Sequence, residues 1–421
     1  MKELIDYCWK HKMLEGIPEN VEVIDTGLQN RHKGPDFFNA KIRIGSTMWV
    51  GNVVTLDKAS DWNEKGFDKD EKYKNVVLIV VLEDDAEMMN ANGDLVSYIV
   101  PSIPEMVNEN YQRLMEDGYD ECLRYNSEHC SRLMYHSWMA ALQTEWLDMT
   151  TNKAIVLYKT SGSWTDTHFV MLAREFGQGV NEDIYEKWAK QLNFEALRHH
   201  QDDLFQLEAM MLGTAGLLEL DAIPEECQKE ALNEGYFAKL RNEYMYLAHK
   251  YGLPRMDHRE WRGGMNPHYT PQRCISWLAN WFYMCKDMKV ESLTFDELRS
   301  KYSSKVTPYW ITHSQFGRVG DYGELLRKIL PNDLIMKVAA PFYFACGRET
   351  HNEDLCDNAF DLMEQGAVMV GGCFREWRSY GFPLYNGGDC LGVIQQREEY
   401  CAKKQCLRCR FGYEYFKNFK A

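Results

Sequence analysis

The stretch Gly34-Pro35-Asp36-Phe37 places a carboxylate at the entrance of a predicted strand. Such an acid can hold a hard cation like Mg²⁺ when the neighbouring strand offers an acid-x-base pair, because the pair supplies a second carboxylate and a group that positions the attacking water. On the next predicted strand, positions 54 and 56 share one face. They are Val54 and Leu56, which offer no ligand, so Asp36 is the member of such a site that remains.

Replacement groups for this site can be named. Lys58 shares the face of positions 54 and 56 if the strand continues, and Asp57 or Glu22 could serve as the second acid, although Asp57 should point to the opposite face. A structural alternative exists for Asp36, because an Asp after Pro commonly accepts hydrogen bonds from nearby backbone N–H groups. A lysine at a strand end is most often solvated.

A second group with chemical potential is Cys401-x4-Cys406-x2-Cys409. Three thiols at this spacing can bind Zn²⁺, and plant-type ferredoxins use a comparable spacing for an iron–sulfur cluster. Either group needs a fourth ligand. Upstream candidates, which the sequence does not rank, are Cys390, Cys373, Cys130 and His351. The alternative is an amphipathic helix whose cysteines are small buried hydrophobic residues.

The same segment is basic. Its cationic residues are Arg397, Lys403, Lys404, Arg408, Arg410, Lys417 and Lys420, against Glu398, Glu399 and Glu414, which is net +4. Interleaved Tyr and Phe residues could stack on bases while Lys403, Lys404, Arg408 and Arg410 contact phosphates. A terminal helix that lays its aromatic face on the protein and its lysines in water has the same composition.

The chain as a whole is acidic and globular in composition. It has 421 residues, 45% hydrophobic and 26% charged, which excludes a collagenous or disordered chain. The 63 acidic residues exceed the 48 basic ones by 15, so nucleic-acid binding would need a local basic patch.

The N-terminus and the cysteines indicate the cellular compartment of the protein. The first residues of the chain include several charged side chains, whereas a signal peptide has an apolar stretch there. The longest apolar run that stands out, residues 76–82, is far too short to span a membrane. Thirteen scattered cysteines favour reduced thiols. The sequence therefore predicts a cytoplasmic protein with no membrane partner, and it does not indicate an oligomeric state.

Hydrophobic periodicity predicts a mixed α+β protein, with an N-terminal α/β domain followed by a mainly α-helical region. A first helix precedes predicted strands at 21–25, 37–44, 48–56, 76–82 and 95–100. The predicted later helices lie near 131–158, 167–176, 202–218, 232–250, 271–286 and 323–345. We expect a nuclease-like domain over 1–118, a helical domain over 119–302, and a second helical domain over 303–421 that carries the Cys-bearing tail.

Several segments together resemble an uncharacterised bacterial family, domain of unknown function 2851. They are GPDFFNAKIRIG, WVGNV, SDW, YKNVVLIVV, LAREFG, DDLFQLEAMMLGTAGLL and YCAKKQCLRC. The family pattern implies Glu-x-His after WVGNV, two histidines after SDW, and another in the aliphatic strand. The matching positions here are Val54, Leu56, Lys65, Phe67 and Ile79. The resemblance, with the Pro-Asp geometry, implies a restriction-endonuclease-like domain whose Mg²⁺ or Mn²⁺ site is lost.

Three functions follow as hypotheses. The first is a catalytically degenerate nuclease-like module that binds nucleic acid or a protein partner, so that this chain is not an enzyme. The second is an active metal-dependent phosphodiester hydrolase with substituted ligands, which requires a cluster of acids around Asp36. The third is a structural scaffold or assembly protein with an aromatic surface.

Overall fold

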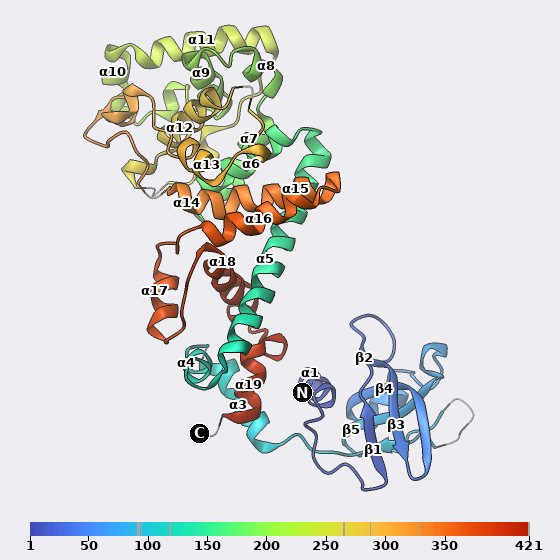
Figure 1. Ribbon diagram of the computed structural model, residues 1–421. Coiled ribbons are helices and arrows are strands. Elements are labelled where there is room, and N and C mark those ends of the chain that lie inside the picture. The colour runs from blue at the N-terminus through green and yellow to red at the C-terminus, as the bar shows by residue number, and fades with distance from the viewer. Residues whose placement is uncertain are drawn as a thin grey trace. The chain divides into compact units, whose positions relative to one another are not determined.

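The computed structural model describes residues 1–90, 93, 95–117, 119–263, 266–286, 288–327 and 329–419. Chain packing divides it into two units (Figure 1). Unit 1 is Met1–Tyr135 with Gln396–Ala421, and unit 2 is His136–Gln395. The three-domain division at 118 and 302 stays a prediction, and residue 118 lies outside the described residues.

Unit 1 contains the sheet and a group of helices. Its first half consists of α1 (Lys2–Lys10), β1 (Val21–Asp25), β2 (Leu28–Gln29), β3 (Phe37–Ile44), β4 (Thr47–Lys58), α2 (Asp61–Glu64), β5 (Val76–Glu83) and β6 (Tyr98–Ile99). The helices are α3 (Glu105–Asp117), α4 (Asp120–His129) and the C-terminal α19 (Arg410–Asn418). Within unit 1, α19 packs on α3 and α4, although nearly 300 residues separate it from them in sequence.

The sheet is mixed, with the order β1-β3-β4-β5-β6, and β2 pairs with β3. β1, β3 and β4 pair antiparallel, whereas β4, β5 and β6 pair parallel. The register places Val54 beside Ile79. α1 packs on β4, with Leu4, Ile5 and Cys8 buried. The apolar run of β5 is buried at its centre, as expected of a strand covered on both faces.

Unit 2 is helical apart from the short pair β7 (His313–Gln315) and β8 (Arg318–Val319). Its helices are α5 (Arg132–Ser161, which begins in unit 1), α6 (Trp164–Glu175), α7 (Glu182–Gln191), α8 (Phe194–His199), α9 (Leu204–Thr214), α10 (Glu225–Glu234), α11 (Tyr236–Tyr251), α12 (Pro271–Met284), α13 (Phe295–Lys301), α14 (Pro331–Leu334), α15 (Ala340–Thr350), α16 (Glu353–Gln365), α17 (Gly372–Ser379) and α18 (Gly387–Gln395). α9 packs on α11 and α12, and its residues 207–214 are buried. Gly213 permits this packing, because a Cβ there would lie 2.1 Å from Cδ2 of Tyr244.

The coarse fold prediction is confirmed: the protein is mixed α+β, with the sheet first and helices after it. Several boundaries were wrong. The strand at 95–100 shrinks to Tyr98–Ile99, and the helix at 202–218 ends at Thr214. A left-handed Gly235, with φ of 73°, separates α10 from α11 within the predicted helix 232–250. The helix at 323–345 begins only at Pro331, because proline favours the first turn.

No helix in the described parts of the chain combines the length and the apolar character that a bilayer crossing needs.

Candidate functional site

Asp36 lies just before β3 and holds β3 to β4. Its Oδ2 accepts a hydrogen bond from the Thr55 backbone N–H at 2.9 Å and one from the Thr55 hydroxyl at 3.3 Å. The same oxygen pairs with Lys2 Nζ at 2.8 Å. Because Thr55 is fully buried, its N–H would otherwise lack a partner. The backbone donor to Asp36 thus lies 19 residues away in the neighbouring strand, whereas the structural interpretation expected backbone N–H groups of the same turn.

A second carboxylate, Asp6, joins this arrangement from α1. Lys2 Nζ lies 3.0 Å from Asp6 Oδ1, and the Thr55 hydroxyl also donates to that oxygen. Burial raises the pKa of Asp6, and the charge of Lys2 opposes the shift. We call Lys2, Asp6, Asp36 and Thr55 the Asp36 cluster. Sequence reasoning missed Lys2 and Asp6, although their i,i+4 spacing on the first predicted helix was a usable signal.

Four of the five positions matched to the family's polar residues meet in one apolar cluster. Val54, Leu56 and Ile79 are at most 3% exposed and pack with Trp62. Phe67 is partly buried against them. The other members of this apolar cluster are Ala59, Val81 and Met88, with Tyr73, Val76 and Val96 at its margin. The cluster offers no oxygen or imidazole ligand from these positions, so it can exclude water but cannot hold a cation there.

The fifth position, Lys65, pairs with Asp61 at 3.1 Å. Lys58 also stays at the surface, where its Nζ lies 3.0 Å from Oε2 of its strand neighbour Glu83. The hydrogen bond to Glu83 raises the pKa of Lys58, which keeps it cationic. Neither lysine is placed in the Asp36 cluster.

The two acids suggested as replacement ligands, Glu22 and Asp57, lie on different strands. Glu22 pairs with Arg43 at 2.5 Å on the neighbouring strand. Asp57 lies two residues after Thr55 in β4, so its side chain points to the same face of the strand. Its Oδ1 is buried and has no hydrogen-bond partner among the described residues. The acid that shares Lys2 and Thr55 with Asp36 is Asp6, which comes from a helix.

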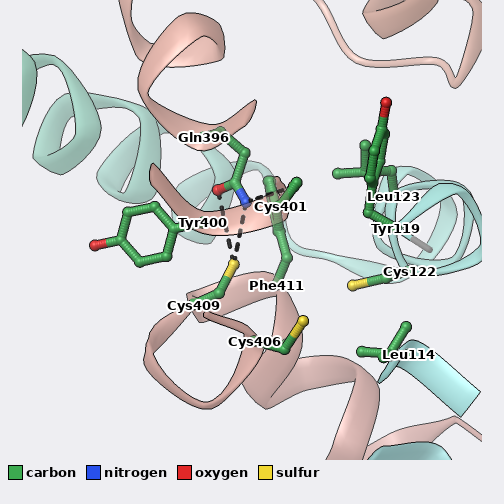
Figure 2. A pocket seen from close by; sticks show the side chains of 11 residues that line it. Leu114, Tyr119, Cys122, Leu123, Gln396, Tyr400, Cys401, Cys406, Cys409 and Phe411 are labelled. Atoms are coloured by element: carbon green, nitrogen blue, oxygen red, sulfur yellow. Dashed lines mark hydrogen bonds between the residues drawn. The ribbon is translucent and has the colours of Figure 1, made fainter. Parts of the chain in front are cut away.

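The C-terminal cysteines line a small cavity in unit 1 (Figure 2). Cys401 ends the π-helical turn Gln396–Cys401, Cys406 begins the 3₁₀ turn Cys406–Arg408, and Cys409 precedes α19. Gln396 Nε2 donates to the Sγ atoms of Cys401 and Cys409, each at 3.3 Å. Burial raises the pKa of both Cys401 and Cys406 to about 12.

A fourth thiol, Cys122 of α4, lines the same cavity. The upstream candidates Cys390, Cys373, Cys130 and His351 are not among the residues that line it. Cys390 Sγ instead accepts the backbone N–H of Met369 at 3.3 Å. As the side chains of the described residues lie, no three His, Cys, Asp or Glu are arranged to hold a metal ion.

Comparison with known protein families adds one result. A family profile described as "Protein of unknown function (DUF2851)" matches residues 2–368. The chain belongs to the DUF2851 family. A search of curated proteins and a search of solved structures each found no match. The DUF2851 match includes the Asp36 cluster and the apolar cluster, and it ends before the three C-terminal cysteines.

The basic segment of this DUF2851 chain is largely bonded within unit 1. Lys403 pairs with Glu399 at 2.6 Å, Arg410 pairs with Glu414 at 2.8 Å, and Lys404 Nζ donates to the Met115 carbonyl. Arg408 is exposed, and Lys420 lies outside the described residues.

Three aromatic residues of this segment pack inward. Phe411, Tyr415 and Phe416 are fully buried. Tyr415 packs edge-on against Tyr125 of α4, with ring centroids 5.7 Å apart. These rings therefore build the interior of unit 1 and present no stacking surface.

Unit 2 contains a polar pocket of about 480 Å³, the size of a small-molecule site. Glu175 and Asp333 line it, and Lys337 lies 3.7 Å from Glu175. Burial raises the pKa of Glu175 and of Asp333, and Lys337 opposes both shifts. Lys337 sits in a π-helical turn, Ile335–Ala339, a feature frequent at functional sites. The available signal was the segment LAREFG, which contains Glu175.

Proposed function

We propose that this DUF2851 chain is a catalytically inactive, nuclease-like module that acts by binding a protein partner. The apolar cluster is the observation that carries the proposal. Val54, Leu56, Phe67 and Ile79 stand where the family resemblance implies one glutamate and three histidines, and they pack together. Since a hard cation needs oxygen ligands, a nuclease of this type cannot assemble its metal there.

The Asp36 cluster supports the same conclusion. A divalent cation bound by Asp36 would lie next to its Oδ2 atom. Lys2 Nζ occupies that place, 2.8 Å from Oδ2. Asp6 is bound to the same ammonium at 3.0 Å. Lys2 thus neutralises part of the negative charge that would attract a metal. Thr55 also hydrogen-bonds to both carboxylates, which leaves fewer of their lone pairs for a metal.

A protein partner is favoured over nucleic acid by charge and by packing. The chain carries a net charge of −15, which repels phosphate backbones. Lys403 and Arg410 of the basic segment are paired with acids of their own helix turns. Phe411 and Tyr415 are buried and therefore closed to base stacking.

The exposed end of β4 offers a surface for such a partner. β5 pairs with β4 from Asn52 onward, so in the described pairings residues 47–50 have a strand neighbour only in β3. Met48, Trp49 and Val50 are 51%, 47% and 60% exposed. An apolar strand with one open edge can accept an added strand from another chain.

Catalysis is tested by incubating the purified chain with single- and double-stranded DNA and RNA, with Mg²⁺ or Mn²⁺. We expect no cleavage above that of buffer for the wild type or for Asp36→Ala. Asp296→Ala is the matched control, because Asp296 is an exposed acid in unit 2. Cleavage that persists in Asp296→Ala and disappears in Asp36→Ala would overturn the proposal.

Partner binding is tested by affinity capture from cells followed by reconstitution with the purified partner. Trp49→Lys should abolish the interaction, while Leu133→Lys, at an 81% exposed position in α5, should keep it. A captured protein that both variants bind equally would show that β4 is not the surface. Tight binding of DNA or RNA at physiological salt would contradict the choice of a protein.

One observation favours the alternative of an active hydrolase. Asp6 and Asp36 approach each other closely enough to share Lys2 and Thr55, so a pair of acids does exist beside Asp36. Metal-dependent cleavage that needs both Asp6 and Asp36 would support this alternative.

A further inference from the structure

Four thiols from two distant stretches of sequence converge on one cavity in unit 1. Cys122 comes from α4, and Cys401, Cys406 and Cys409 come from the C-terminal segment (Figure 2). Cys122 and Cys409 are buried, while Cys401 and Cys406 are partly exposed. Nearly 280 residues separate Cys122 from Cys401, so packing of α4 and not local sequence brings the fourth thiol to the other three.

The backbone of the C-terminal segment turns its three cysteines toward the same side. Lys404 adopts a left-handed conformation with φ of 50° and donates its N–H to the Cys401 carbonyl at 3.1 Å. Cys409 N–H then donates to the Cys406 carbonyl at 3.2 Å. Gly412 lets α19 approach this loop, because a Cβ there would lie 2.1 Å from the Cys406 carbonyl oxygen.

Polar side chains around the cavity act on the sulfur atoms. Gln396 donates to Cys401 and Cys409, and Asn126 Nδ2 lies 3.5 Å from Cys122 Sγ. Asn126 also donates to the Phe411 carbonyl at 3.0 Å, which ties α4 to the C-terminal segment. Hydrogen bonds from outer groups to thiolates are what a metal site uses to orient its ligands.

The size and lining of the cavity select a single ion. Its volume is about 20 Å³, which is room for about one water-sized sphere and too little for an iron–sulfur cluster. The rest of the lining includes Leu114, Leu123 and Phe411. Such an apolar wall keeps water from competing for the ion.

We propose that Cys122, Cys401, Cys406 and Cys409 bind one structural Zn²⁺ in tetrahedral geometry. The thiols give up as many as four protons to solvent, and the site then carries a net charge of −2, which the nearby Arg397 and Lys404 offset. In the side-chain positions of the described residues, the sulfurs are not so arranged. Binding therefore requires the four side chains to rotate inward until each sulfur lies about 2.3 Å from the ion.

The test measures metal in the purified full-length chain. Elemental analysis should find about one zinc per chain in the wild type and far less than one in Cys122→Ser. Cys390→Ser is the matched control, because Cys390 is also buried but lies outside the cavity lining, and this variant should keep its zinc. Replacement of zinc by Co²⁺ in the wild type should produce the thiolate charge-transfer band and the intense visible bands of a tetrahedral site.

Each remaining outcome overturns the proposal in a defined way. A wild type without stoichiometric metal, and without a cobalt–thiolate spectrum after reconstitution, removes the site altogether. Full zinc content in Cys122→Ser removes Cys122 as the fourth ligand. Iron with inorganic sulfide in place of zinc removes the single-ion assignment. The cobalt spectrum needs no variant, so the proposal stays testable if Cys122→Ser does not fold, and all results are independent of the proposed function.

Discussion

Replacing Val54 by Glu tests whether the apolar cluster has replaced a polar site. Val54 is 1% exposed and packs with Leu56 and Ile79, which are equally closed to water. A carboxylate in such a place has its pKa raised by about 3 to 5 units, because burial disfavours the charged form. A folded-state pKa about 3 units above the unfolded value of ~4.3 costs about 4 kcal/mol at neutral pH.

The larger side chain adds about 1 to 3 kcal/mol of overpacking. The sum, about 5 to 7 kcal/mol, is comparable to the whole stability of a typical domain. The pH dependence has a definite sign. The folded state of Val54→Glu holds its proton above pH ~4.3 while the unfolded chain loses it, so the variant is destabilised progressively as the pH rises from about 4 to about 7.

Amide hydrogen exchange of peptides from β4 and β5 measures this effect locally. Val54→Glu should lose protection in both strands at neutral pH and regain part of it in acid. Val50→Glu is the control, since Val50 lies in the same strand but is 60% exposed, and it should change stability by less than about 0.5 kcal/mol. Equal protection in the two variants at neutral pH, or tight Mg²⁺ binding by Val54→Glu alone, would refute the reasoning.

Three further predictions concern other parts of the chain. Burial lowers the pKa of His168 to about 3, whereas the pKa of a histidine in the unfolded chain is ~6.5. Between pH 7 and pH 5 the unfolded chain therefore binds a proton that the folded chain does not, and the free energy of unfolding of unit 2 should fall by about 2 kcal/mol. Denaturant titrations at the two pH values should show this loss in the wild type and not in His168→Gln. Asp36→Ala should lower the stability of unit 1 by about 1 to 3 kcal/mol, because the buried Thr55 N–H and Lys2 lose their partner, and unchanged denaturation midpoints would contradict this. Gly412→Ala should lower the free energy of unfolding of unit 1 by about 1 to 3 kcal/mol, because the added Cβ would clash with the Cys406 carbonyl. Amide hydrogen exchange should show this as lost protection in α19, and protection equal to the wild type would show that the chain relieves the clash without cost.

The local sequence was enough to place much of the sheet. The period-two alternation placed β1 and β3 at the residues where they occur, and the continuous apolar run predicted the buried β5. The predicted helix at 202–218 was too long because α9 ends at Thr214, just before Gly216, whose left-handed φ of 75° turns the chain next to the Met256 carbonyl.

Functional groups were predictable only where they are close in sequence. The C-x4-C-x2-C spacing pointed to the thiols of Cys401, Cys406 and Cys409, because a short loop keeps such groups together. Nothing in the sequence pointed to Cys122, since its place at the cavity depends on the packing of α4 against α19. Lys2 and Asp6 reach Asp36 for the same reason, through the packing of α1 on β4.

The amino-acid sequence alone determined that four of the five positions matched to a metal site carry aliphatic or aromatic side chains, since identity at a position needs no fold. Only the tertiary structure decided that Val54, Leu56, Phe67 and Ile79 meet in one cluster and that Lys2 lies against Asp36. The reason is physical: side-chain identity fixes what chemistry is available, but strand register and helix packing fix which groups come within reach of one another.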